Sequence, residues 1–207
     1  MREISKTYIR DDWFLVFKNK ELTDVRYVTE FERELSKFTS IPYVCGLANA
    51  TSALFLGSTA IGVSSNSKCL IPSYSHNAIK VVLEYIGASV DYIDIKEKTL
   101  CMDPSLLKSY LEHNKSVNYV FFINHLGYVG EDLLEIKKIC DFYNVVLIED
   151  SSQGLGEVYD GMSAGSIGEF GVYSFSGTKL IRCGKGGAIV TGNQHIHSRI
   201  EKLATLS

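Results

Sequence analysis

Two adjacent carboxylates follow a short apolar run in the second half of the chain. The run occupies residues 145–148 and leads directly into Glu149-Asp150. In an open parallel α/β sheet, ligands bind at the carboxyl ends of strands, so an acidic side chain there can hold a cationic partner. Asp150 could pair with the pyridine nitrogen of pyridoxal phosphate (PLP), bind magnesium or cap a helix. The carboxylates alone leave these three interpretations open.

A second candidate site is the turn Asn49-Ala50-Thr51-Ser52, which follows an apolar run and opens a helical segment. The free N–H groups and the positive dipole end of a helix start bind anions, and the Thr51 and Ser52 hydroxyls could add donors. The turn therefore suits a phosphate. An ordinary helix N-cap formed by Asn49 or Thr51 explains the same residues equally well.

Lys179 is the third candidate, because it follows the apolar run at 171–175. A lysine near a strand end can be desolvated, which lowers the pKa of its amine and makes it a competent nucleophile for imine formation. A lone lysine is more often a solvated surface charge. Two nucleotide loops are excluded: position 179 is not glycine, so no ATP-binding loop ends at Lys185, and no G-x-G-x-x-G follows the first strand.

His76 lies just past another expected strand end, in the segment at 71–78. A flat side chain in this position can stack on an aromatic ring. The alternative is a histidine at a helix N-terminus that contacts no ligand.

The segments that would position these residues alternate between short apolar runs and longer helical stretches. This pattern predicts a three-layer α/β/α fold with a mostly parallel sheet. An amphipathic helix carrying Tyr27, Phe31, Leu35 and Phe38 precedes it and ends before Pro42. The apolar runs lie at 43–46, 69–71, 90–93, 117–123, 145–148, 171–175 and 188–190, and the helical stretches at 51–61, 76–86, 104–112, 132–143 and 194–206.

Composition is that of one globular domain. The 207 residues are 45% hydrophobic with a net charge of −3, and no basic run predicts a nucleic-acid or anionic-membrane partner. The first 13 residues do not read as a signal peptide, and no apolar run approaches the ~20 residues of a membrane span. We therefore expect a cytoplasmic protein that binds neither nucleic acid nor membrane.

The five cysteines are scattered and form no C-x-x-C pair, so neither a disulfide framework nor a zinc site is predicted. We expect reduced, mostly buried thiols, and no metal. Cys183 lies near the proposed site, where a packing role is expected rather than a nucleophile. The cysteines are Cys45, Cys69, Cys101, Cys140 and Cys183.

Taken together and in this order, these segments resemble the DegT/DnrJ/StrS-type nucleotide-sugar aminotransferases, a branch of the fold-type I PLP-dependent enzymes. The resemblance runs from about Val25 to the end of the chain. It rests on Phe31-Glu32, Ala50-Thr51, residues 72–76, His125, residues 149–156, residues 174–179 and residues 184–187.

The resemblance implies roles for individual residues. Lys179 would form the Schiff base with PLP and later carry the proton between substrate carbon and cofactor, while Asp150 would pair with the pyridine nitrogen. Gln153 would contact the ring or its hydroxyl, and His76 would stack on the ring. Ala50, Thr51 and Ser174 would hold the phosphate.

The reaction implied by the resemblance moves an amino group, usually from glutamate, onto a keto carbon of a nucleotide-linked deoxysugar used in surface polysaccharides or related sugars. Lysine at position 179 favours amino transfer, because PMP-dependent dehydratases of the family carry histidine there. The sequence departs from the family pattern at Leu180, Lys185 and His76, where asparagine, glutamate and another aromatic residue are usual.

Family members are close to twice as long as this chain. Residues 1–207 would then be the PLP-binding large domain with its N-terminal helical segment, and the C-terminal small domain would be absent. We expect weak or no activity unless a second polypeptide completes the enzyme, as a homodimer or a complementing chain. A truncated PLP-binding or dimerising module without catalysis and a PLP-dependent sugar dehydratase are the alternatives.

Overall fold

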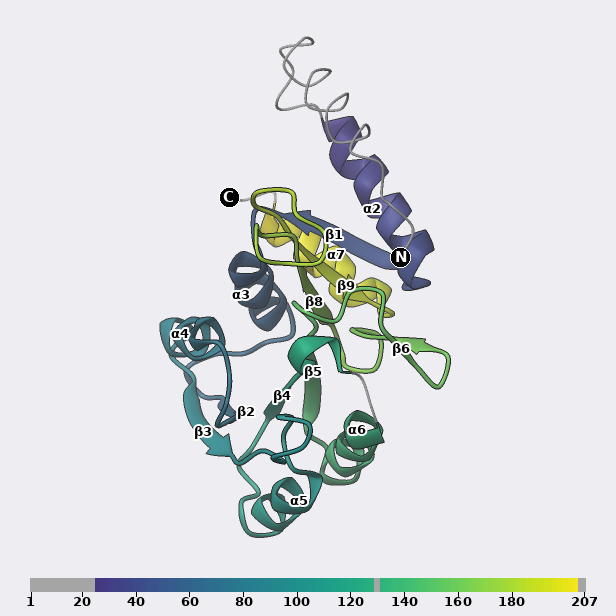
Figure 1. The fold of residues 1–207 in the computed structure, drawn as a ribbon. Helices are drawn as coiled ribbons and strands as arrows, with labels where there is room; N and C mark the ends of the chain where they lie inside the picture. Colours follow the sequence, from purple (N-terminus) through teal and green to yellow (C-terminus); the bar gives the residue numbers. More distant parts are fainter. Residues whose placement is uncertain (1–24, 129–130, 205–207) are drawn as a thin grey trace.

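The computed structural model describes residues 25–128 and 131–204 (Figure 1). The first 13 residues, for which we expect no signal peptide, and the last two residues of the expected helix at 194–206 lie outside the described residues. None of the described helices is both long and apolar enough to cross a membrane.

Seven strands of the described chain form one sheet in the order β1-β9-β8-β5-β4-β2-β3. Only β9 runs against its two neighbours, and the remaining pairs are parallel, as the alternation of elements predicts. The strands are β1 (Tyr43–Leu47), β2 (Lys68–Pro72), β3 (Ser89–Ile93), β4 (Tyr119–Ile123), β5 (Val146–Asp150), β8 (Gly171–Ser174) and β9 (Gly187–Thr191).

Helices cover both faces of this sheet. Three of them, α3, α4 and α7, pack on one face, and α2, α5 and α6 pack on the other, as Figure 1 shows. The predicted three-layer α/β/α architecture is confirmed. The helices are α2 (Val25–Thr39), α3 (Ala50–Ala60), α4 (Asn77–Ile86), α5 (Pro104–His113), α6 (Glu131–Tyr143) and α7 (Gln194–Ala204).

The central strand β4 illustrates why these residues form this fold. Phe121 and Ile123 face the core under α3, α4 and α7, whereas Val120 and Phe122 face the core under α5 and α6. Successive side chains of a strand point to opposite faces, so a strand covered on both sides is a continuous apolar run. The unbroken run in β4 therefore identifies a central strand of a parallel sheet.

The glycine-rich segment between β5 and β8 contains a small hairpin that the sequence analysis did not predict. Its strands are β6 (Val158–Tyr159) and β7 (Met162–Ser163). Asp160 and Gly161 form the two-residue connection, and both have positive φ. An Asp-Gly pair suits such a turn, so this dipeptide was the signal that could have revealed the hairpin.

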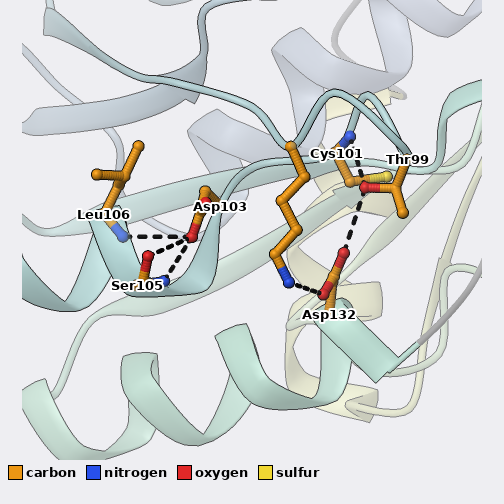
Figure 2. Close-up of polar contacts among 7 residues, drawn as sticks. Thr99, Cys101, Asp103, Ser105, Leu106 and Asp132 are labelled. Atoms are coloured by element: carbon orange, nitrogen blue, oxygen red, sulfur yellow. Dashed lines mark hydrogen bonds and ion pairs between the residues drawn. The ribbon is translucent and has the colours of Figure 1, made fainter.

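A polar cluster around the buried Asp132 joins the segment that leaves β3 to the start of α6. The Asp132 carboxylate, at the first turn of α6, accepts hydrogen bonds from the Lys96 Nζ at 2.6 Å and the Thr99 Oγ1 at 3.3 Å (Figure 2). Asp103 caps α5 beside it and accepts from the Ser105 backbone N–H at 2.8 Å. Asp132 is buried while the Lys96 side chain is 39% exposed, so these contacts satisfy the buried carboxylate and join the two segments.

Candidate active site

The carboxyl ends of the parallel strands meet at one edge of the sheet, and the predicted site residues lie there. Ala50 follows β1, His76 follows β2, and Asp150 and Ser174 are the last residues of β5 and β8. Such an edge is where open α/β sheets bind ligands.

Asp150 is a nearly buried carboxylate, 5% exposed. Its Oδ1 accepts a hydrogen bond from the Ser152 backbone N–H at 3.0 Å, while its Oδ2 has no hydrogen-bond or ion-pair partner among the described residues. A buried carboxylate costs free energy unless a partner satisfies it. The free oxygen therefore suits a cationic group of a ligand.

The turn after β1 is an N-cap and an anion-binding candidate at once. Asn49 caps α3, because its Oδ1 accepts from the Ser52 backbone N–H at 2.8 Å. The backbone N–H groups of Ala50 and Thr51 have no acceptor within their helix or elsewhere in the described chain. These two N–H groups remain available to a phosphate.

Gly187 brings this turn close to Ser174. A Cβ at position 187 would lie 2.3 Å from the carbonyl carbon of Asn49, so only glycine lets the turn approach β9 this closely. Gly187 also pairs with Ser174 across the sheet. The Ser174 hydroxyl, which has no hydrogen-bond partner in the described part of the chain, thus belongs to the same region as the turn.

The ends of β2, β4 and β5 are tied to one another. The Gln153 Oε1 accepts from the Leu126 backbone N–H at 2.8 Å. His125 is buried, contacts the Tyr74 carbonyl oxygen through Nε2 at 2.8 Å and stacks on the Tyr74 ring with centroids 5.0 Å apart. Tyr74 was not among the predicted site residues, although its position just past the end of β2 is typical of an aromatic residue near a ligand.

His76 is the N-cap of α4. Its Nδ1 accepts from the Ala78 backbone N–H at 3.2 Å, and its ring is exposed. This arrangement agrees with the alternative interpretation of His76, in which the histidine caps the N-terminus of a helix. Stacking of His76 on a cofactor stays a prediction.

Lys179 lies in residues 176–186, which connect β8 to β9 and are called the lysine loop below. Backbone hydrogen bonds from Phe175 to Gly186 (2.9 Å) and from Cys183 to Phe175 (3.0 Å) close the base of this loop. The Lys179 side chain is half-buried, and its Nζ has no hydrogen-bond or ion-pair partner among the described residues. No such contact joins Lys179 to Asp150.

Glu149, the strand neighbour of Asp150, is fully buried and was not a predicted site residue. Burial raises the pKa of Glu149, while hydrogen bonds from backbone N–H groups of residues 165–168 and from Asn124 oppose that shift. Asn124 also donates to the Ser151 Oγ at 2.7 Å. Glu149, Asn124, Ser151 and residues 164–168 are called the carboxylate bracket below.

An apolar hollow of about 1200 Å³ adjoins the turn after β1. Its walls come from α2, α3, α4 and the end of the lysine loop, and include Tyr27, Phe55 and Tyr85. Thr51 and Ser52 line it, but Asp150 and Lys179 do not. The hollow therefore reaches the turn after β1 but not the carboxylate of Asp150.

Four of the five cysteines are buried, as predicted, and Cys183 is exposed on the lysine loop. Burial raises the pKa of the Cys69 and Cys140 thiols to about 12, so both are protonated at neutral pH.

Comparison with known protein families identifies the family of this chain. The DegT/DnrJ/EryC1/StrS aminotransferase family matches residues 7–207. This chain belongs to that family. The family consists of PLP-dependent enzymes, in agreement with the cofactor expected from the sequence.

Two curated relatives show the range of the family. UDP-4-amino-4,6-dideoxy-N-acetyl-beta-L-altrosamine transaminase of Campylobacter jejuni is 32% identical over 187 residues, which is 90% of this chain and 49% of the relative. The putative pyridoxal phosphate-dependent aminotransferase EpsN of Bacillus subtilis is 29% identical over 184 residues. This match covers 87% of this chain and 46% of EpsN. This chain thus spans about half the length of these relatives.

Among solved structures, that of DesI in the presence of its TDP-sugar product superposes with a TM-score of 0.86 at 25% identity. The match covers 98% of this chain and 51% of DesI.

Two departures from the family pattern, Leu180 and Lys185, are exposed on the lysine loop.

Proposed function

We propose that this chain is the PLP-binding part of an aminotransferase that acts on a nucleotide-linked keto-deoxysugar, with glutamate as the amino donor. Membership of the aminotransferase family supports this proposal, as do the nucleotide-sugar names of its relatives.

The geometry of Asp150 is the observation that carries the proposal. PLP, when bound, supplies an electron sink that stabilises negative charge on the substrate carbon. Asp150 keeps one carboxylate oxygen free of protein partners at the strand edge, so it can hold a proton on a ring nitrogen. The Ser152 N–H orients the carboxylate from its other oxygen.

The turn after β1 would bind the phosphate. The Ala50 and Thr51 N–H groups donate at the positive end of α3, and the hydroxyls of Thr51 and Ser174 add two donors. The Gln153 amide would orient the ring from the β5 end, and His76 would cover it from the β2 end.

Lys179 would hold the cofactor covalently through Nζ and then move a proton at that same atom. Its amine has no ion-pair or hydrogen-bond partner within the described chain, so no protein group occupies Nζ. A lysine with this freedom can act first as nucleophile and afterwards as general base.

A spectrum of the purified chain with added PLP tests this assignment. We expect a yellow absorption band that borohydride makes permanent and that the Lys179→Ala variant lacks. A colourless protein, or a band unaffected by the substitution, would contradict the cofactor site.

We also propose that residues 1–207 are the large domain and that a small domain, not contained in this chain, completes the enzyme as part of a homodimer or as a complementing polypeptide. Amino transfer by the 207-residue chain alone is then expected to be weak. Robust turnover would contradict this. Release of a 3-deoxysugar without net amino transfer would instead identify a dehydratase, and PLP binding without turnover in a completed assembly would identify a binding module.

A further inference from the structure

We propose that Glu149 and Asn124 are positioning residues that hold the Asp150 carboxylate in the orientation needed at the cofactor ring. This inference rests on the proposed function, because Asp150 has its role only in a PLP site.

Glu149 is a fully buried carboxylate that backbone and side-chain amides satisfy. Its Oε1 accepts from the N–H groups of Ile167 at 2.6 Å and Gly168 at 2.7 Å. Its Oε2 accepts from the Gly165 N–H at 2.7 Å and the Asn124 Nδ2 at 3.3 Å. Four donors around one carboxylate form an anion-binding pocket, and leaving any of them unpaired in the core would be costly.

The loop that supplies these donors can close on Glu149 only because of its glycines. Gly165 has a φ of +88°, which favours glycine. A Cβ at Gly168 would lie 2.9 Å from the Leu147 carbonyl oxygen, and one at Gly171 would lie 2.4 Å from the Gly165 Cα. The loop is therefore packed against β5 at the residues that precede Asp150.

Asn124 forms hydrogen bonds with three consecutive residues at the end of β5, which are residues 149–151. Its side-chain amide donates to Glu149 and to the Ser151 Oγ, and its backbone N–H donates to the Asp150 carbonyl oxygen at 3.0 Å. Asp150 is thus held from its own backbone and from both neighbours.

Glu149 cannot serve the cofactor directly. Successive side chains of a strand point to opposite faces of the sheet, so Glu149 and Asp150 point away from each other. Leu147, on the Glu149 side, packs in the core under α5 and α6, and Ile148, on the Asp150 side, packs under α3, α4 and α7. We therefore attribute the effect of Glu149 on the site to the position of Asp150.

The test compares Glu149→Gln and Asn124→Ala with a control, Asp132→Asn, in the full 207-residue chain. Asp132 is also a buried, hydrogen-bonded carboxylate, and it lies at the start of α6 (Figure 2). No hydrogen bond or ion pair joins it to Asp150 among the described residues. Each of the three variants alters a hydrogen bond of a buried side chain, so a merely structural effect appears in the control as well.

The first readout needs no cofactor. The Ser152 amide donates to the Asp150 Oδ1, so its hydrogen exchange reports whether that carboxylate keeps its place. We expect exchange about tenfold faster in Glu149→Gln and Asn124→Ala than in Asp132→Asn. Equal rates in the three variants would overturn the proposal.

The second readout is the pH midpoint at which the absorption band of the PLP-loaded protein titrates. Both bracket variants should shift it by about half a pH unit or more in the direction produced by Asp150→Asn, with no shift in Asp132→Asn. A midpoint equal to the wild-type value would overturn the proposal.

Asn124→Ala decides the question if Glu149→Gln does not fold, because it leaves the three backbone donors of Glu149 in place. A wild-type chain that binds no PLP would contradict the proposed function, and the exchange rates would still decide whether the bracket holds Asp150.

Discussion

The carboxylate bracket, which we propose positions Asp150, and the lysine loop, which carries Lys179, are built in opposite ways. The Glu149 carboxylate of the bracket is fully buried and has four donors, whereas the loop has Leu180 81% exposed and Ile181 49% exposed. A buried carboxylate with several hydrogen bonds has one preferred arrangement, while an exposed loop has few contacts to select one. The contacts of this chain therefore define the bracket closely, whereas they define the surroundings of Lys179 much less.

The largest effect on stability is expected from Gly171→Ala, because the new side chain would clash with Gly165 of the bracket. The new Cβ would meet the Gly165 backbone at 2.4 Å, and backbone cannot move aside as a flexible side chain can. We expect a loss of about 3 kcal/mol in the free energy of unfolding, at the upper end for overpacking. Urea denaturation measures it, and a loss below about 1 kcal/mol would mean that the bracket is not rigid.

Gly187→Ala should separate cofactor binding from the bracket. Its Cβ would lie 2.5 Å from the Ala50 nitrogen and displace the turn after β1. We expect the dissociation constant for PLP, followed by absorbance titration, to rise at least about tenfold, the factor that corresponds to 1.4 kcal/mol. Gly192→Ala is the matched control, because no atom lies within 4 Å of a Cβ there. Equal affinities of the two variants would refute the role of the turn.

Asp103→Ala provides a reference change in stability at a position outside both the bracket and the lysine loop. This N-cap of α5 should contribute about 1 kcal/mol at pH 7. A hydrogen bond from the Ser105 hydroxyl, more than those from backbone N–H groups, holds the pKa of Asp103 below its ordinary value. Because the folded pKa is the lower one, this contribution is present above the unfolded pKa of about 3.9 and is lost as the pH falls through the folded value.

Urea unfolding of wild type and Asp103→Ala at pH 7 and near pH 3 checks this sign. The difference between the two proteins should shrink at the lower pH. A difference that grows under acid would exclude the carboxylate cap as its origin.

The smallest effect is expected from Gly177→Ala in the lysine loop. No atom lies within 4 Å of a Cβ at this position. The free energy of unfolding should change by less than about 0.5 kcal/mol, as at other surface positions without special contacts. A loss comparable with that of Gly171→Ala would show that the loop is as tightly packed as the bracket, and the comparison would fail.

Much of the fold could be predicted because its signals are local. The apolar run in β4 and the helical spacing of Tyr27, Phe31 and Leu35 are patterns of neighbouring residues, and α2 and β4 lie where they were expected. Of these three residues of α2, Leu35 is buried and Tyr27 is 47% exposed. The β6–β7 hairpin was missed because each strand has two residues, too few for a periodic pattern.

The candidate site was predictable in its residue types but not in its contacts. Asp150, Thr51 and Ser174 were recognisable because they end strands or begin a helix. Glu149 was passed over as a site residue, because no sequence pattern says that an acidic side chain faces a loop closing 16 to 19 residues later.

The amino-acid sequence was sufficient for the alternation of elements and for the family, since periodicity and short motifs are properties of neighbouring residues. The roles of Lys179 and Asp150 stay predictions. The order of the strands, the reversal of β9 and the four donors around Glu149 were decided by the tertiary structure. These features depend on close approach between distant segments, such as Gly187 against Asn49 and Gly171 against Gly165, and only packing of the whole sheet brings those backbones together.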